Sequence, residues 1–176
     1  MPGVTLNADG REQAERLGRR LSREHVDFVN SSPSERARET ADPISRLTGA
    51  PLNVVPALDE IDFGAWTGRT FEEISGDPGW QQWNTARAAA QVPGGETMLQ
   101  AQQRAIGHLD DLRAAHPNAR AVLVSHGDIL RSVVLYCLGM SLDDFGRIEI
   151  SPGSISSVVV EDWGAKVLAL NEVVAP

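Results

Sequence analysis

His126 is the side chain in this sequence whose surroundings point most directly to chemistry. It follows the apolar run 121–124 after Ser125, and Gly127 comes next. The run has the β-branched character of a buried strand, and a helical pattern of apolar residues begins just after Gly127. In open α/β sheets ligands bind where a strand ends and a helix begins, and an imidazole there can donate to a bound anion. A structural histidine with a satisfied hydrogen bond explains the pattern equally well.

Arg36 is a second candidate because it is a cation in the first turn of an expected helix. Ser32 suits the N-cap, Pro33 the first helical position, and Glu35 completes a capping box. A guanidinium is unusual there, since the helix dipole favours anions at that end. Arg36 is either a solvated charge offset by neighbouring glutamates or a phosphate ligand that acts together with the helix amides.

A third candidate is an acid in the segment 58–64, which contains Asp59, Glu60 and Asp62 among apolar residues. One of these carboxyl groups could be half-buried, with a pKa raised enough to protonate a leaving group. All three could equally be solvated charges on a loop. The residue types alone do not choose among the three acids.

The elements that must position these residues alternate between strands and helices. This alternation predicts an α/β fold with a mostly parallel sheet, in which the last two strands form an antiparallel pair. Glu96 is expected in the first turn of its helix, where the dipole favours an acid. Strands are predicted near 26–30, 52–55, 121–124, 147–150, 154–160 and 166–170, and helices near 8–24 with Asn7 as N-cap, 32–48, 80–90, 96–116 and 127–139.

Composition limits the classes of partner. The chain of 176 residues is long enough for one domain with a real core, which we expect to span residues 1–176. Its net charge of −8 argues against a nucleic-acid surface. No apolar run reaches the length of a membrane span, and the start at Met1 lacks the pattern of a signal peptide, so we expect a cytoplasmic protein. The four histidines lack metal-ligand spacing, and no metal is expected.

Five segments in this order resemble motifs of the histidine phosphatase superfamily, also called phosphoglycerate mutase-like. The resemblance covers nearly the whole chain. It implies a three-layer α/β/α sandwich with a mostly parallel sheet. The segments are Thr5–Ala14, Ser31–Thr40, Leu58–Gly68, Pro93–Thr97 and Val124–Gly127.

One motif of the family is absent from this sequence. Members begin with an apolar strand that ends in Arg-His-Gly or Arg-His-Ala, and that histidine is the nucleophile. This chain starts at Met1–Val4, just after the place where the segment should end, so we expect the first, central strand to be missing. A late start codon, a shortened sequence or a true pseudoenzyme would each explain this, and the first is favoured because the other site residues remain. Loss of a central strand is expected to destabilise the chain or to make it oligomerise.

The resemblance also implies roles. Arg36, His126 and Gly127 would bind the phosphoryl group, with Arg36 and His126 offsetting charge in the transition state, and Glu60 would protonate the leaving oxygen. No metal or other cofactor is implied. The implied partner is a small phosphorylated metabolite or inorganic phosphate.

The implied activity is hydrolysis of a phosphate monoester through a phosphohistidine, with this chain inactive as given because it lacks the nucleophile. A phosphoglycerate mutase is an alternative that the short segment 61–92 disfavours. A non-catalytic domain that binds phosphorylated ligands is the other alternative.

Overall fold

The computed structural model describes residues 3–175 and contains a parallel sheet of three strands. The strands β1 (Phe28–Ser31), β2 (Leu52–Val54) and β3 (Ala121–Val124) lie in the order β2-β1-β3. Ser31 of β1 is level with Val124 of β3 in the register. The residues that follow these two strands therefore meet at one edge of the sheet.

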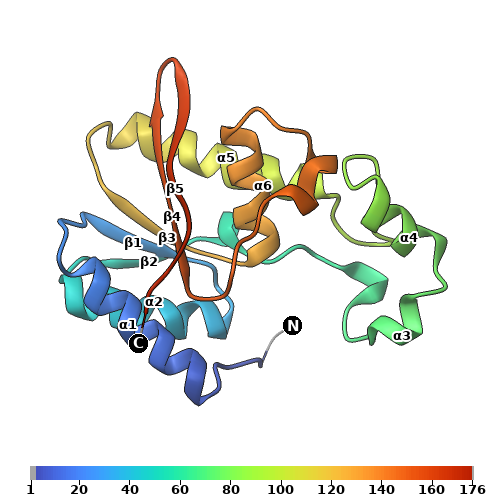
Figure 1. Ribbon diagram of the computed structural model, residues 1–176, viewed down its shortest axis with the longest axis horizontal. Helices are drawn as coiled ribbons and strands as arrows, with labels where there is room; N and C mark the ends of the chain where they lie inside the picture. The colour runs from blue at the N-terminus through green and yellow to red at the C-terminus, as the bar shows by residue number, and fades with distance from the viewer. Residues whose placement is uncertain (1–2, 176) are drawn as a thin grey trace.

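Helices cover both faces of this sheet, as the α/β prediction requires (Figure 1). The helices α1 (Ala8–Leu21) and α2 (Glu35–Thr48) pack together on one face and share a buried apolar cluster with β1 and β3. The helices α5 (Met98–Ala115) and α6 (Gly127–Cys137) contribute to a second buried cluster. The predicted α/β class with a parallel sheet is confirmed.

A long hairpin completes the strands. The strands β4 (Ser154–Glu161) and β5 (Gly164–Val173) pair antiparallel, which confirms the predicted pair. The strand predicted over 147–150 is wrong. A 3₁₀ helix, η3 (Leu142–Arg147), ends at the first residue of that range, and residues 148–150 form no strand. The inward turn of Leu142 and Phe145 into the buried cluster favours the helix.

The segment between β2 and α5 is built from short elements, which are η1 (Pro56–Leu58), η2 (Gly64–Trp66), α3 (Phe71–Ile74) and α4 (Pro78–Thr85). The helix predicted over 80–90 starts earlier, because Asp77 caps α4 and Pro78 takes its first turn. Figure 1 shows α3 and α4 projecting to one side of the molecule.

The start of α5 differs from the prediction. Thr97 is its N-cap and forms a capping box with Gln100, so Glu96 precedes the helix and does not belong to its first turn. At the other end of the chain, Asn7 caps α1 through the N–H of Gly10, as expected. Over residues 3–175, no helix combines the length and the apolar character needed to cross a membrane.

Candidate active site

His126 lies directly beyond β3 as the N-cap of α6, and its side chain is 4% exposed. Arg36 reaches it from the first turn of α2, with Nη2 2.9 Å from the imidazole Nδ1. Ser32, just past β1, places its Oγ 2.8 Å from Nε2. The two strand ends and the start of α2 therefore hold the imidazole from both sides.

The hydrogen bonds define the tautomer of His126. Arginine can only donate, so Nδ1 must accept from Arg36 and the proton must sit on Nε2. Nε2 then donates to Ser32 Oγ, and Ser32 Oγ donates to Asp59 Oδ1 over 3.0 Å. Burial, assisted by the charge of Arg36, lowers the pKa of His126 to about 4. The imidazole is therefore neutral near pH 7 in the free protein.

The predicted N-cap at Ser32 is wrong. The helix α2 begins at Glu35 with Ser34 as N-cap, so neither Pro33 nor Glu35 takes the position predicted for it. Ser32 is fully buried and its hydroxyl is committed to His126 and Asp59, although it also accepts from the Ser34 N–H over 3.1 Å. Ser32, which has the sequence context of a helix N-cap, thus orients the imidazole of His126 instead.

Glu60 is the acid of segment 58–64 that contacts both of the other candidates. Its Oε2 lies 3.3 Å from Arg36 Nη2 and 3.4 Å from His126 Nδ1. Burial raises the pKa of Glu60, and the charge of Asp128 acts in the same direction. A carboxyl group in this state can carry a proton toward a leaving group.

The other two acids of that segment have different surroundings. Asp59 accepts from Ser32 and from the Glu60 N–H, whereas Asp62 accepts from the Gly64 N–H on the exposed side of the loop. The geometry therefore brings Glu60, Arg36 and His126 together. The fourth predicted residue, Gly127, is adjacent as the first residue of α6.

Arg104 of α5 fixes the loop that carries Glu60, and the sequence reasoning missed it. Its guanidinium donates to the carbonyl oxygens of Ala57 and Glu60 over 2.7 and 3.1 Å. It also pairs with Glu96 over 2.7 Å, which explains why an acid precedes α5. The sequence carried no signal for this role, because Glu96 lies before α5 and the two carbonyl groups are 44 and 47 residues away in the chain.

The loop that carries Glu60 is also held where its backbone at Asp62 crosses the backbone of residues 95–96. The Glu96 N–H donates to the Asp62 carbonyl over 2.8 Å. A Cβ at Gly95 would lie 2.2 Å from that same oxygen, so only glycine fits. The Gly-Gly pair at 94–95 thus allows the acidic loop and the entry to α5 to touch.

A second missed pair lies on the other side of Glu60. Arg87 Nη1 is 3.8 Å from Asp128 Oδ2, and burial raises the pKa of the Asp128 carboxyl. The guanidinium of Arg87 stacks 3.8 Å from the centroid of Phe145, and its Nη1 is buried without a hydrogen-bond partner. Arg87 therefore has a free donor near the cluster.

A cavity of about 780 Å³ opens beside Arg36, Glu60 and Arg87. It has room for the non-phosphate part of a small ester. Its wall also includes charged side chains such as Arg38, Arg69 and Asp62, together with five aromatic side chains, which are Phe63, Trp66, Phe71, Trp80 and Trp83. Within residues 3–175, no group of three or more His, Cys, Asp or Glu side chains is arranged to hold a metal ion.

Comparison with known proteins identifies the class. The family model of the histidine phosphatase superfamily (branch 1) matches residues 1–173, and the chain belongs to this family. Phosphoserine phosphatase 1 of Hydrogenobacter thermophilus is 30% identical over 168 residues, which are 94% of this chain and 80% of that relative.

Two further relatives are similar in sequence or in fold. A probable phosphoglycerate mutase GpmB of Erwinia tasmaniensis is 29% identical over 87% of this chain and 72% of its own length. The solved structure of Bacillus stearothermophilus YhfR superposes with a TM-score of 0.91 at 26% identity, covering 98% of this chain and 89% of that one. The family resemblance read from the sequence is confirmed.

Proposed function

We propose that this chain provides the phosphate-binding and proton-donating groups of a phosphomonoesterase that acts on a small phosphorylated metabolite. The supporting observation is the contact of Arg36, Glu60 and His126 within 3.4 Å, beside a cavity large enough for a small ester. An incoming phosphoryl group exchanges Glu60 for its own oxygens at Arg36. The guanidinium fork then donates to the phosphoryl oxygens, and His126, released from Arg36 at Nδ1, takes up a proton there so that it can donate to them as well.

The reaction proposed for this site has two displacements. A histidine nitrogen attacks phosphorus, the ester P–O bond breaks, and Glu60 gives its proton to the leaving oxygen. Water then attacks the phosphohistidine, Glu60 takes a proton from that water, and inorganic phosphate leaves with the histidine restored.

None of the chain's other histidines is placed to attack. His25 pairs with Asp27, His108 contacts Asn30, and the ring of His116 packs 5.2 Å from that of Phe28. His126 itself is held by Arg36 and Ser32 as a phosphate ligand. The proposed reaction therefore needs a histidine that the 176 residues do not provide, and without it the chain binds phosphate esters and does not turn them over.

The need for a further histidine favours one alternative, a non-catalytic domain that binds phosphorylated ligands. A non-catalytic domain for phosphorylated ligands would use the same Arg36 and His126 and would need no nucleophile. A mutase is disfavoured, as from the sequence, because the segment 61–92 is short and contains only the short elements η2, α3 and α4.

Hydrolysis of p-nitrophenyl phosphate distinguishes these proposals. The chain alone should be inactive. A version extended before Met1 by an apolar strand and Arg-His-Gly should hydrolyse the ester, and the same extension with Arg-Ala-Gly is the matched control. In the active version, Glu60→Gln and His126→Ala should each lower kcat by roughly a hundredfold or more.

An extended protein that binds vanadate but stays inactive would contradict the phosphatase proposal and support the non-catalytic one. Conversion of 3-phosphoglycerate by the extended protein, faster than hydrolysis of p-nitrophenyl phosphate, would establish the mutase.

A further inference from the structure

The cavity beside Arg36 and Glu60 contains a carboxyl group whose acceptor positions are open. Asp128 lies in the first turn of α6, two residues beyond His126, and its side chain is 33% exposed on the cavity wall. Within residues 3–175 this carboxylate accepts no hydrogen bond, and Arg87 Nη1, at 3.8 Å, is too distant for one. Asp128 can therefore accept hydrogen bonds from a ligand in the cavity.

The neighbouring Arg87 is held by other contacts. Its Nε donates to the Trp83 carbonyl over 3.1 Å, and its guanidinium stacks on the ring of Phe145. Arg131 of α6 stacks on the same ring, 4.6 Å from its centroid. These contacts hold Arg87 close enough to attract the Asp128 carboxylate but too far away to donate to it.

A second acceptor in the same wall also lacks a donor. Glu35, the first residue of α2, has its Oε2 buried with no hydrogen-bond partner among residues 3–175. A buried acceptor is costly unless a donor reaches it. The wall therefore favours a ligand that brings hydrogen-bond donors as well as a phosphate.

Aromatic faces form another part of this cavity. Phe71, the first residue of α3, is 76% exposed, and its ring centroid lies 5.8 Å from that of Trp80 in α4 at a tilt of 36°. Trp66 is buried and contacts Trp80 edge-on from behind. Because the face of an aromatic ring is electron-rich, the exposed faces of Phe71 and Trp80 attract a cation.

The charges of the wall agree with a positive group in the ligand. In the proposed function Arg36 is occupied by the phosphoryl group, and Arg38 and Arg69 are exposed, where solvent screens their charge. The acidic side chains of the wall outnumber the arginines that remain. They are Glu35, Asp59, Glu60, Asp62 and Asp128.

We propose that this cavity binds the ammonium group of a phosphate ester whose leaving group is an amino alcohol, with Asp128 as the acceptor and with Phe71 and Trp80 facing the positive charge. This inference rests on the proposed function, because the phosphoryl group at Arg36 and His126 anchors the ester. The positive end of such an ester also suits a chain whose net charge is −8.

Titration calorimetry of the whole chain at pH 7.5 tests this proposal with three esters. O-phosphoethanolamine carries the ammonium group, propyl phosphate has a methyl group in its place, and phosphoglycolate carries a carboxylate there. We expect O-phosphoethanolamine to bind roughly tenfold more tightly than propyl phosphate. Phosphoglycolate should bind more weakly than either.

Three variants assign the preference for the amine to the cavity wall. Asp128→Asn should reduce the tenfold ratio between the first two esters to about threefold or less. Phe71→Leu keeps an apolar side chain and should reduce the ratio by about two- to fivefold. Asp162→Asn removes the same charge from the fully exposed end of the β4–β5 hairpin and should leave the ratio unchanged.

The outcomes separate this inference from the proposed function. Equal affinity for the first two esters, tighter binding of phosphoglycolate, or a ratio that Asp128→Asn leaves unchanged would overturn the inference while phosphate esters still bind. Failure of all three esters and of vanadate to bind would instead reject the proposed function, and this inference with it.

Discussion

Arg36 contacts both the neutral imidazole of His126 and the carboxyl group of Glu60. Its substitution should therefore weaken ligand binding more than the removal of a positive charge elsewhere on the chain. We predict that Arg36→Gln weakens the binding of vanadate or phosphate by roughly 10- to 100-fold, the loss expected for charge-assisted hydrogen bonds from one guanidinium. Titration calorimetry measures this. Arg46→Gln removes the same charge from the exposed end of α2 and should change the affinity less than twofold. Similar losses in both variants would indicate a general charge effect.

His126 also makes a prediction for stability. Its pKa is about 4 when folded and near 6.5 when unfolded, so the unfolded chain binds the proton more tightly. The stability contributed by the neutral imidazole is complete above pH 6.5 and is lost as the pH falls through 4, by an amount on the order of 3 kcal/mol. Glu60, whose pKa is raised, acts in the opposite direction above its unfolded value, so a variant is needed to isolate the histidine.

Urea unfolding from pH 7.5 to 4.5 measures the effect. The free energy of unfolding of the native chain should fall relative to that of His126→Gln across this range. His25→Gln removes a histidine whose side chain is 80% exposed and serves as the control. An equal relative fall against both variants would contradict the assignment to His126.

At the scale of elements, Gly18 determines how closely α1 and α2 approach. A Cβ at Gly18 would lie 2.7 Å from the carbonyl oxygen of Pro43, a backbone atom that cannot easily move. We predict that Gly18→Ala destabilises the chain by about 1–3 kcal/mol through this overpacking. Gly107→Ala in α5 is the matched control, since nothing lies within 4 Å of its Cβ position. That control should be stabilising by about 0.5–1 kcal/mol, as helix propensity requires.

Denaturant midpoints of the two variants measure the difference. Equal midpoints would show that the helix pair can separate to accept the methyl group.

The sequence was sufficient for the elements with strong local signals. The apolar run 121–124 and the helix after it, the cap at Asn7, and the antiparallel pair at the end of the chain were predicted from residue pattern alone. The predicted strand at 147–150 failed because Leu142 and Phe145 are drawn into a core that periodicity cannot detect. Ser32 was misassigned for a similar reason, since its partner His126 is 94 residues away.

Among the site residues, pattern alone left each role open. Arg36 could have been solvated, and Glu60 could not be distinguished from Asp59 or Asp62. The family resemblance pointed to Glu60, and the structure brings it to Arg36 and His126. Arg104 and Arg87 were missed because their partners come from other elements and only folding brings them together.

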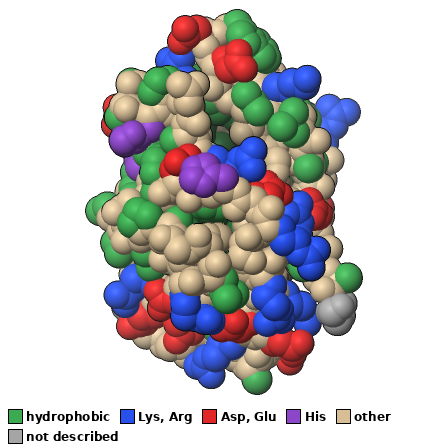
Figure 2. All heavy atoms as spheres, turned by 90° about the vertical axis from the view of Figure 1, so that its left-hand side faces the viewer, with side chains coloured by type: hydrophobic (Ala, Val, Ile, Leu, Met, Phe, Trp, Pro, Cys, Tyr) green, Lys and Arg blue, Asp and Glu red, His purple; other side chains and the backbone are tan. Residues whose placement is uncertain are grey.

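At the scale of the whole molecule, the net charge of −8 must coexist with the proposed site for an anion. Charges of both signs are interspersed over the face shown in Figure 2, and the cations of the site are paired with acids. The site therefore acts on its ligand at short range, and long-range attraction contributes little.

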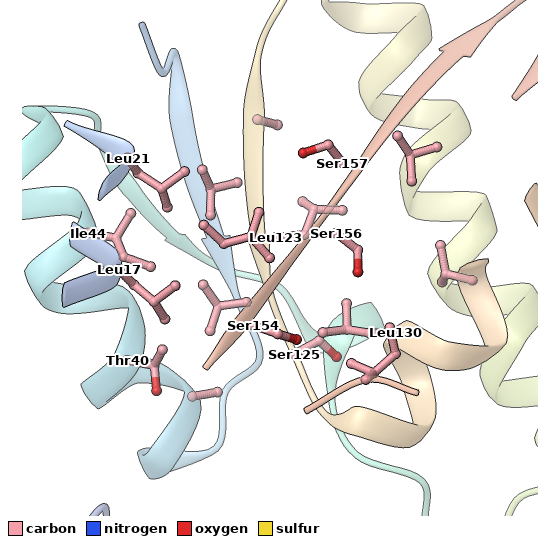
Figure 3. Close-up of a pocket in the computed structure, with 18 of the residues that line it drawn as sticks. Leu17, Leu21, Thr40, Ile44, Leu123, Ser125, Leu130, Ser154, Ser156 and Ser157 are labelled. Atoms are coloured by element: carbon pink, nitrogen blue, oxygen red, sulfur yellow. The ribbon is translucent and has the colours of Figure 1, made fainter. Parts of the chain in front are cut away.

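A cavity of about 790 Å³ between β3 and β4 gives a prediction for the molecule as a whole (Figure 3). Its half-buried apolar lining should bind the dye anilinonaphthalene sulfonate and raise the dye's fluorescence under native conditions. Dye fluorescence that stays unchanged when the native chain is added would contradict this prediction.

Arg104 has a consequence for the time course of folding. It joins α5 to carbonyl groups 44 and 47 residues earlier in the chain, and His126 joins Ser32 across 94 residues. Contacts of such long sequence separation form slowly because each closes a large loop. A fragment with only its local structure in place lacks the contacts that assemble the proposed anion site. Vanadate added during refolding should therefore be captured only in the final phase, which makes the ligand a reporter of completed folding.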